Sequence, residues 1–141
     1  MKTWRTILGS IVGVVLAFLV GTLADDAGHS MYPVPTDIDW SDVNAVRRYT
    51  ASLPAGALLL MLAGWVGATF AGAAIGSAIV RPRAILISII VGGLMLAATI
   101  VNFLMTPYPW WFVMATITGI VAASWLAAKL AWKPAGPSTS A

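Results

Sequence analysis

Long apolar runs, separated by short polar segments, make up most of this sequence. Four of them are long enough to cross a membrane, since about 20 largely apolar residues span roughly 30 Å of hydrocarbon. These runs cover about 6–24, 53–80, 84–104 and 110–131. No Asp, Glu, Lys, Arg or His lies inside them before Lys129. The pattern predicts an all-α membrane protein, a bundle of four transmembrane helices.

The first apolar run has a second interpretation, as a cleaved signal peptide. Thr22-Leu23-Ala24 resembles a small-residue cleavage site. The apolar core from Ile7 to Ala24 is, however, longer than the roughly 7–15 residues typical of such peptides. We therefore expect a retained first span.

The loop between the first two spans, residues 25–52, is the longest polar stretch. Two prolines near its start favour extended backbone. Ser41 or Asp39 is the expected N-cap of a short helix that runs to about Thr50. Three apolar residues of this helix recur at intervals of three and form a strip that we expect to rest on the membrane surface: Val43, Val46 and Tyr49.

The composition agrees with a membrane protein. Of the 141 residues, 60% are apolar and 9% are charged, whereas soluble domains are about 45–50% apolar and about 25% charged. So short a soluble chain could not bury this much apolar surface. We expect one transmembrane domain over 1–133 and a disordered cytoplasmic tail over 134–141.

The distribution of charge predicts an orientation. Six basic residues fall on one side of the predicted bundle: Lys2, Arg5, Arg81, Arg83, Lys129 and Lys133. Arg47 and Arg48 fall on the other side, with all five acidic residues. Because cytoplasmic segments carry the excess of Lys and Arg, both termini are predicted to be cytoplasmic. The basic residues flank apolar runs and form no patch, so no nucleic-acid partner is expected.

Small residues recur at intervals of four in three of the runs, which places them on one side of each helix. They are Gly9, Gly13, Ala17 and Gly21; Gly64, Ala68, Gly72 and Gly76; and Ala115, Gly119, Ala123, Ala127 and Ala131. Such ridges let transmembrane helices approach closely. We expect them to pack the four helices into one bundle. The alternative is that the ridge of the second run is an oligomerisation face.

Tryptophans lie near the ends of the predicted spans, where amphipathic rings favour the headgroup region. The predicted interface anchors are Trp4, Trp40, Trp110, Trp111 and Trp132. For Trp110 and Trp111 the alternative is a role in stacking against a ligand. Pro107 and Pro109 predict a tight turn between the third and fourth spans.

One cluster has side chains of the metal-ligand type: Asp25, Asp26 and His29. In a continuous helix they would lie three and four residues apart, on one side. One histidine and two carboxylates make an incomplete site for most transition metals. A solvated helix end is therefore the expected interpretation. Acidic groups are unfavourable at a helix C-terminus, so either the helix continues or Arg47 or Arg48 pairs with them.

The rest of the sequence contains little that could catalyse a reaction. There is no Cys, no Glu and a single His, and the glycines are spaced for packing, not for a phosphate-binding loop. We predict no enzymatic activity and no cofactor.

The chain resembles the small multidrug resistance transporters in size and layout. Those proteins depend on a membrane-embedded Glu in their first helix, and this chain has none. An intramembrane ionisable group is the usual mark of proton coupling, so its absence argues against that mechanism.

Three segments resemble a group of small, uncharacterised bacterial four-helix membrane proteins. They are Gly28–Pro35, Ser52–Gly56 and Pro107–Phe112. The resemblance implies placement in a bacterial inner membrane. In that group a His often stands where this chain has Tyr108, so a second histidine on this face is missing here.

These observations predict a structural or accessory role in a membrane assembly. Its partners would be the lipid bilayer and either further copies of the chain or a larger membrane protein. The alternative is a small oligomeric transporter or channel-like protein for a neutral or lipophilic solute.

Overall fold

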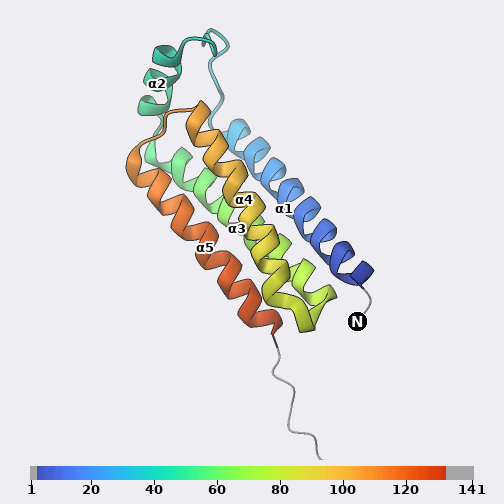
Figure 1. The fold of residues 1–141 in the computed structure, drawn as a ribbon. Helices are drawn as coiled ribbons and strands as arrows, with labels where there is room; N and C mark the ends of the chain where they lie inside the picture. Colours follow the sequence, from blue (N-terminus) through green and yellow to red (C-terminus); the bar gives the residue numbers. More distant parts are fainter. Residues whose placement is uncertain (1–2, 133–141) are drawn as a thin grey trace, which may run out of the picture.

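The computed structural model describes residues 3–132, and its regular elements within that range are all helices (Figure 1). Four of them are long and apolar enough to cross a membrane: α1 (Thr3–Met31), α3 (Ala55–Ile79), α4 (Ala84–Met105) and α5 (Trp110–Ala131). The short helix α2 (Val43–Ser52) and a 3-10 turn, η1 (Arg81–Arg83), connect them. The predicted all-α four-helix bundle is confirmed. The tail predicted over 134–141 lies outside the described residues.

The four long helices lie alongside one another, and successive helices run in opposite directions (Figure 1). The beginning of α1 and the end of α5 therefore reach the same end of the bundle (Figure 1). At the opposite end lie α2 and the turn between α4 and α5 (Figure 1). We call residues 32–54 and 106–109 together the cap.

Helix α1 continues seven residues beyond the predicted end of the first span at Ala24. With 29 residues and a rise of 1.5 Å per residue, it is about 44 Å long, which exceeds the roughly 30 Å of a bilayer core. The polar residues from Asp25 onward mark where the apolar surface ends. They do not stop the helix, which ends just before Pro33 because proline disfavours α backbone in the preceding residue. The loop predicted to begin at residue 25 therefore begins at Tyr32.

Helices α1 and α3 meet backbone to backbone. A Cβ atom added to Gly13 would lie 2.8 Å from the carbonyl oxygen of Gly72, and one added to Gly76 would lie 2.7 Å from the carbonyl oxygen of Gly9. Real Cβ atoms do not approach other atoms this closely, so any larger residue would push the helices apart. Further along, Gly64 leaves room for the Ala24 methyl group, since an added Cβ would lie 2.7 Å from it.

We call this contact the α1–α3 seam. It joins the two predicted ridges of small residues: Gly9, Gly13, Ala17 and Gly21 of α1 with Gly64, Ala68, Gly72 and Gly76 of α3. Gly21 is the loosest member, because a Cβ there would be an ordinary 3.7 Å from the Cβ of Ala68. The ridge of α3 is thus covered by α1 of the same chain, which disfavours its use as an oligomerisation face.

The glycines of the other contacts differ among themselves. A Cβ on Gly119 of α5 would lie 2.5 Å from a methyl group of Val66, and Gly92 of α4 gives room to Ser124 of α5. At Gly67 and Gly93, in contrast, an added Cβ would meet nothing within 4 Å beyond the adjacent residues and the backbone of its own helix. Gly67 falls outside the four-residue spacing of the α3 ridge, whereas the open Gly93 directly follows the packed Gly92. Spacing therefore identifies the first open position but not the second.

Two sets of side-chain hydrogen bonds lie away from the cap. The hydroxyl groups of Ser77 and Ser88 are 3.0 Å apart in the buried α3–α4 contact, and Ser77 also donates to the carbonyl oxygen of Ala84. The Arg83 guanidinium donates to the Thr6 hydroxyl over 3.2 Å and so joins η1 to the first turn of α1. Hydrogen bonds within a bundle satisfy polar groups that lipid cannot. At the end opposite the cap, hydrogen bonds therefore join η1 to α1 and α3 to α4.

Candidate functional site

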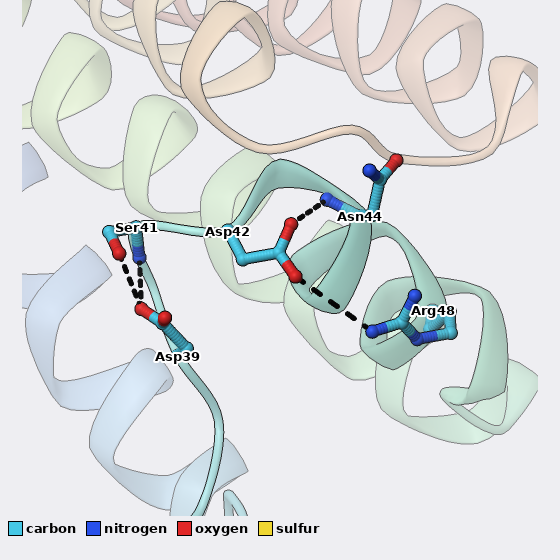
Figure 2. Close-up of polar contacts among 5 residues, drawn as sticks. All are labelled: Asp39, Ser41, Asp42, Asn44 and Arg48. Carbon is cyan, nitrogen blue, oxygen red and sulfur yellow. Dashed lines mark hydrogen bonds and ion pairs between the residues drawn. The ribbon is translucent and has the colours of Figure 1, made fainter.

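Helix α2 is the main element of the cap, and local hydrogen bonds fix where it begins (Figure 2). The carboxylate of Asp42 accepts a hydrogen bond from the backbone N–H of Asn44 over 2.9 Å, which makes Asp42 the N-cap. The predicted cap residues, Ser41 or Asp39, are therefore wrong by one and three positions. Asp39 instead accepts hydrogen bonds from both the N–H and the hydroxyl of Ser41 (Figure 2). Those bonds hold the pKa of the Asp39 carboxyl below its ordinary value.

The strip predicted on α2 faces in two directions. Val46 is buried and Tyr49 is partly buried, whereas Val43 is exposed. Asp42 also lies 3.9 Å from the guanidinium of Arg48 (Figure 2). Both of these charged side chains are well exposed, so the ion pair adds little stability.

A long-range hydrogen bond joins the two parts of the cap, and stacked rings attach the cap to the bundle. The buried hydroxyl group of Thr50 donates to the carbonyl oxygen of Pro107, in the turn between α4 and α5. In the same turn the ring of Tyr108 packs against Phe103 and Phe112, with centroids 5.6 and 5.1 Å apart. Such aromatic pairs have geometric preferences. They therefore fix the turn, and α2 through it.

Phe112 is the centre of this aromatic group and is fully buried. Its ring centroid lies 5.9–6.0 Å from those of Trp65, Phe103 and Trp111. The group thus connects α3, α4 and α5 directly below the cap.

A cavity of about 120 Å³ lies between the cap and the ends of α1 and α3. All three tyrosines of the chain line it, with Trp40, His29 and Asp25. Its remaining lining is mainly aliphatic or backbone: Ala24, Gly28, Val34, Thr50, Leu53, Ala57, Met61 and Thr106. We call this space the cap pocket. It brings together residues from α1, the loop before α2, α2 itself, α3 and the α4–α5 turn.

Two contacts shape the walls of the cap pocket. The rings of Trp40 and Tyr49 meet edge to face at 6.0 Å. Tyr32 follows α1, and its hydroxyl lies 2.7 Å from where a Cβ on Gly56 would be. Gly56 therefore allows the phenol to lie against the first turn of α3. Side chains that contact one another and the backbone of α3 therefore form part of the pocket wall.

Asp25 is the acidic residue of the cap pocket, and it is partly buried. The indole N–H of Trp65 donates to its Oδ1 over 3.1 Å. Within residues 3–132 the single ion pair is that of Arg48 with Asp42, so Asp25 has no basic partner there. Of the two predicted alternatives, continuation of the helix is confirmed, since α1 runs to Met31. Within residues 3–132 neither Asp25 nor Asp26 pairs with Arg47 or Arg48.

Asp25 also lines a second cavity, of about 160 Å³, between α1 and α4. Thr22, Thr99 and Asn102 contribute its other polar side chains, apart from Trp65. The Asn102 Oδ1 atom is buried and, alone among the described buried side-chain atoms, lacks a hydrogen-bond partner. Asn102 lies three residues before the end of α4, about 4–5 Å along the helix. The unpartnered amide oxygen of Asn102 thus lies near the cap end of the bundle.

The metal-ligand candidates do not come together as a set. Asp25 and His29 line the cap pocket, four residues apart on α1. Asp26 is exposed and does not line it. Among residues 3–132 no group of three or more His, Cys, Asp or Glu side chains is placed to hold a metal ion.

The predicted anchors lie at both ends of the bundle and are exposed. Trp4 and Trp132 are at the end opposite the cap, and Trp110 and Trp111 begin α5 beside the cap. Trp40 has a second role that its position in the sequence did not suggest, as a wall of the cap pocket.

Sequence reasoning did not predict the gathering of Tyr32, Tyr49 and Tyr108, or the contact of Trp65 with Asp25. The nearest signal was that a tyrosine accompanies the Pro-x-Pro element of each turn, at Tyr32 and Tyr108. Burial raises the pKa of the Tyr108 phenol to about 12, and the charge of Asp25 adds to the shift. The phenol therefore remains neutral and able to donate a hydrogen bond at ordinary pH.

Comparison of the chain with protein-family models, with curated proteins and with solved structures finds no match.

Proposed function

We propose that this protein is a non-catalytic accessory component of a membrane assembly, held in the bilayer by its four long helices and acting through the cap. The observation that carries the proposal is the contrast in packing. The α1–α3 seam brings backbones together and leaves no room for a solute between Gly13 and Gly72. The varied polar and aromatic side chains gather at the cap. Tightly packed membrane helices together with varied polar and aromatic side chains at one end are what we expect of a protein that binds partners there.

The proposed location is a bacterial inner membrane, with both termini cytoplasmic and the cap on the outer side. The bias of Lys and Arg toward the segments opposite the cap supports this orientation. A reporter active only outside the cytoplasm tests it when fused after Ala141 and, separately, inserted after Asp37. We expect activity from the inserted reporter alone, and activity from the C-terminal fusion would reverse the orientation.

Site-specific crosslinking in cells tests the accessory role. A photoreactive residue replaces Val43, an exposed side chain of α2, and in a matched control it replaces Ile89, an exposed side chain of α4. We expect the probe at position 43 to give one discrete adduct with another polypeptide, and the probe at position 89 to give mainly lipid adducts. Adducts with lipid alone at both positions would contradict the accessory role.

One observation favours transport of a lipophilic solute as the second candidate. An apolar cavity of about 330 Å³ lies between α4 and α5, lined by residues that include Ile89, Gly93 and Trp125. That volume falls at the lower end of the roughly 300–1,000 Å³ typical of ligand pockets. Flux of a neutral lipophilic dye in proteoliposomes, lowered by Gly93→Phe and unchanged by Gly67→Phe, would support transport over the accessory role.

A further inference from the structure

The cap pocket combines a carboxylate that has no basic partner within residues 3–132 and a wall of aromatic rings. A carboxylate has about four acceptor positions, and Trp65 occupies one of those of Asp25. Taking a charged group out of water without a partner is costly. An ionisable residue at the edge of a membrane bundle is therefore a functional candidate whose partner must be identified.

The residues around Asp25 do not supply that partner. Arg47 and Arg48, the basic residues of α2, do not line the pocket. Arg48 lies beside Asp42 on the exposed side of its helix. His29 lines the pocket but does not lie within ion-pair distance of Asp25. Within residues 3–132 no basic side chain balances Asp25, so a separate molecule is the candidate for its counter-ion.

The walls of the pocket favour a particular kind of cation. Tyr32, Tyr49, Tyr108 and Trp40 are four of its lining residues. The faces of such rings attract ammonium groups, and clusters of them recognise alkylated ammonium ions. The rings of Trp40 and Tyr49 meet at an edge-to-face angle of 79°, so these two walls cannot both be flat against the same side of a ligand. Such walls surround a compact group better than they stack on a planar one.

The size of the pocket limits the ligand. Its volume of about 120 Å³ is well below the roughly 300–1,000 Å³ of pockets for drug-sized molecules. Only a small head would fit, with any remainder of the molecule outside the cavity.

From these observations we propose that the cap pocket binds a small organic ammonium ion, with Asp25 as its counter-ion and with Tyr32, Tyr49 and Trp40 as its aromatic walls. The ammonium group belongs either to a free amine or to the headgroup of a lipid at the bilayer surface. Neither the accessory role nor the transport of a solute is assumed, so the proposal stands or fails separately from the proposed function.

Isothermal titration calorimetry on the full-length, delipidated protein in maltoside micelles tests the proposal, with choline chloride as the probe. The matched control ligand is 3,3-dimethyl-1-butanol (dimethylbutanol below), in which a neutral tert-butyl group replaces the trimethylammonium group of choline. We expect saturable binding of choline and binding of dimethylbutanol that is weaker by about tenfold or more, which corresponds to about 1.4 kcal/mol or more. Equal binding of the two ligands, or no saturable binding of choline, would overturn the proposal.

Two neighbouring carboxylates provide the matched variants. Asp25→Asn keeps an oxygen for the Trp65 indole and so preserves the hydrogen bond, but it removes the charge. Asp26→Asn changes an exposed carboxylate outside the pocket. We expect Asp25→Asn to weaken choline binding by about tenfold or more and Asp26→Asn to change it by less than about twofold. Equal effects of the two substitutions would mean that only the surface charge matters.

The aromatic wall is tested at Tyr49. Tyr49→Phe keeps the ring and Tyr49→Leu removes it, while both lack the phenol oxygen. We expect choline affinity to be nearly unchanged in Tyr49→Phe and several-fold lower in Tyr49→Leu. Thermal unfolding of each variant shows whether its fold is intact. An equal loss in both variants would assign the effect to the hydroxyl and contradict an aromatic wall.

The source of the ammonium group is decided by adding lipid to the same titration. Phosphatidylethanolamine presents a primary ammonium group, and phosphatidylglycerol does not. Competition with choline by the first lipid alone would identify a headgroup as the ligand. Undiminished choline binding in both lipids would identify a free amine. Both results support an ammonium site, whereas equal competition by both lipids would assign the pocket to acyl chains and overturn it.

Discussion

The α1–α3 seam and the cap are held together in opposite ways. The seam is made of glycine and alanine, and its strength comes from backbone approach, as at Gly13 and Gly72. The cap is made of hydroxyl, carboxylate and aromatic side chains that contact one another across long separations in sequence, as Thr50 does with Pro107. Close packing is the main contribution along the seam, because apolar side chains gain little by meeting each other in lipid. The cap adds directional bonds, and these leave side chains exposed to a ligand.

The largest expected effect breaks the seam. Gly72→Leu places a side chain where even a Cβ would lie 2.6 Å from the Cβ of Ala17. Overpacking of a well-packed core costs roughly 1–3 kcal/mol or more, and here the obstacle is another helix. We expect a large fall in the thermal unfolding temperature in detergent.

The control for Gly72→Leu is Gly67→Leu, on the same helix. An added Cβ at Gly67 has no other atom within 4 Å, so this variant should unfold close to the wild-type temperature. Similar losses of stability in both variants would show that the cost comes from helix propensity or insertion, not from the seam.

A titration at high pH sharpens the comparison from the side of the cap. The pKa of Tyr108 is raised to about 12 from an ordinary 10.0. The folded protein therefore keeps the phenolic proton over a range of pH in which the unfolded chain loses it. Stability due to this group is fully present below pH 10 and is lost as the pH rises toward 12, by up to about 2 kcal/mol.

Ultraviolet difference absorbance of tyrosinate measures this titration directly. We expect a tyrosine ionisation step near pH 12 in the folded protein, and Tyr108→Phe to remove that step. If this late step survived in Tyr108→Phe and disappeared in Tyr32→Phe, the buried phenol would be that of Tyr32, and the prediction for Tyr108 would be wrong.

The smallest expected effect concerns the attachment of α2. Thr50→Val keeps the shape of the buried side chain but removes the hydrogen bond to Pro107, at a cost of about 1 kcal/mol. We expect amide hydrogen exchange to quicken in α2 while the seam helices stay protected. Thr22→Val is the control, because its hydroxyl bonds only within α1 and is exposed. Faster exchange throughout the bundle would mean that cap and seam unfold together.

Much of the bundle follows from local pattern, and particular residues show where that inference ends. The apolar runs predict four long helices because each run must satisfy its backbone within the bilayer. They do not predict that α1 extends to Met31, because apolarity reports the limit of the membrane and Pro33 decides the limit of the helix. The N-cap is another case. Asp39, Ser41 and Asp42 are all acceptable caps by residue type, and only the backbone path selects Asp42.

The candidate site was far less predictable than the bundle. Asp25 and His29 stood out as the rare ionisable residues of their segment, but their neighbours in space come from residues 32–108. Trp65 lies forty positions from Asp25 in the chain, inside an apolar run that contains no charged residue. No periodicity in the sequence links two such residues.

Hydrophobicity and spacing within single helices were enough to predict a membrane protein, its four spans and its small-residue ridges. The contacts among helices were needed to show which ridges meet and that three tyrosines, Trp40 and Asp25 line one pocket. Helix formation and membrane partition are local properties, whereas a cavity is made by the mutual placement of helices, and that placement depends on how their surfaces fit.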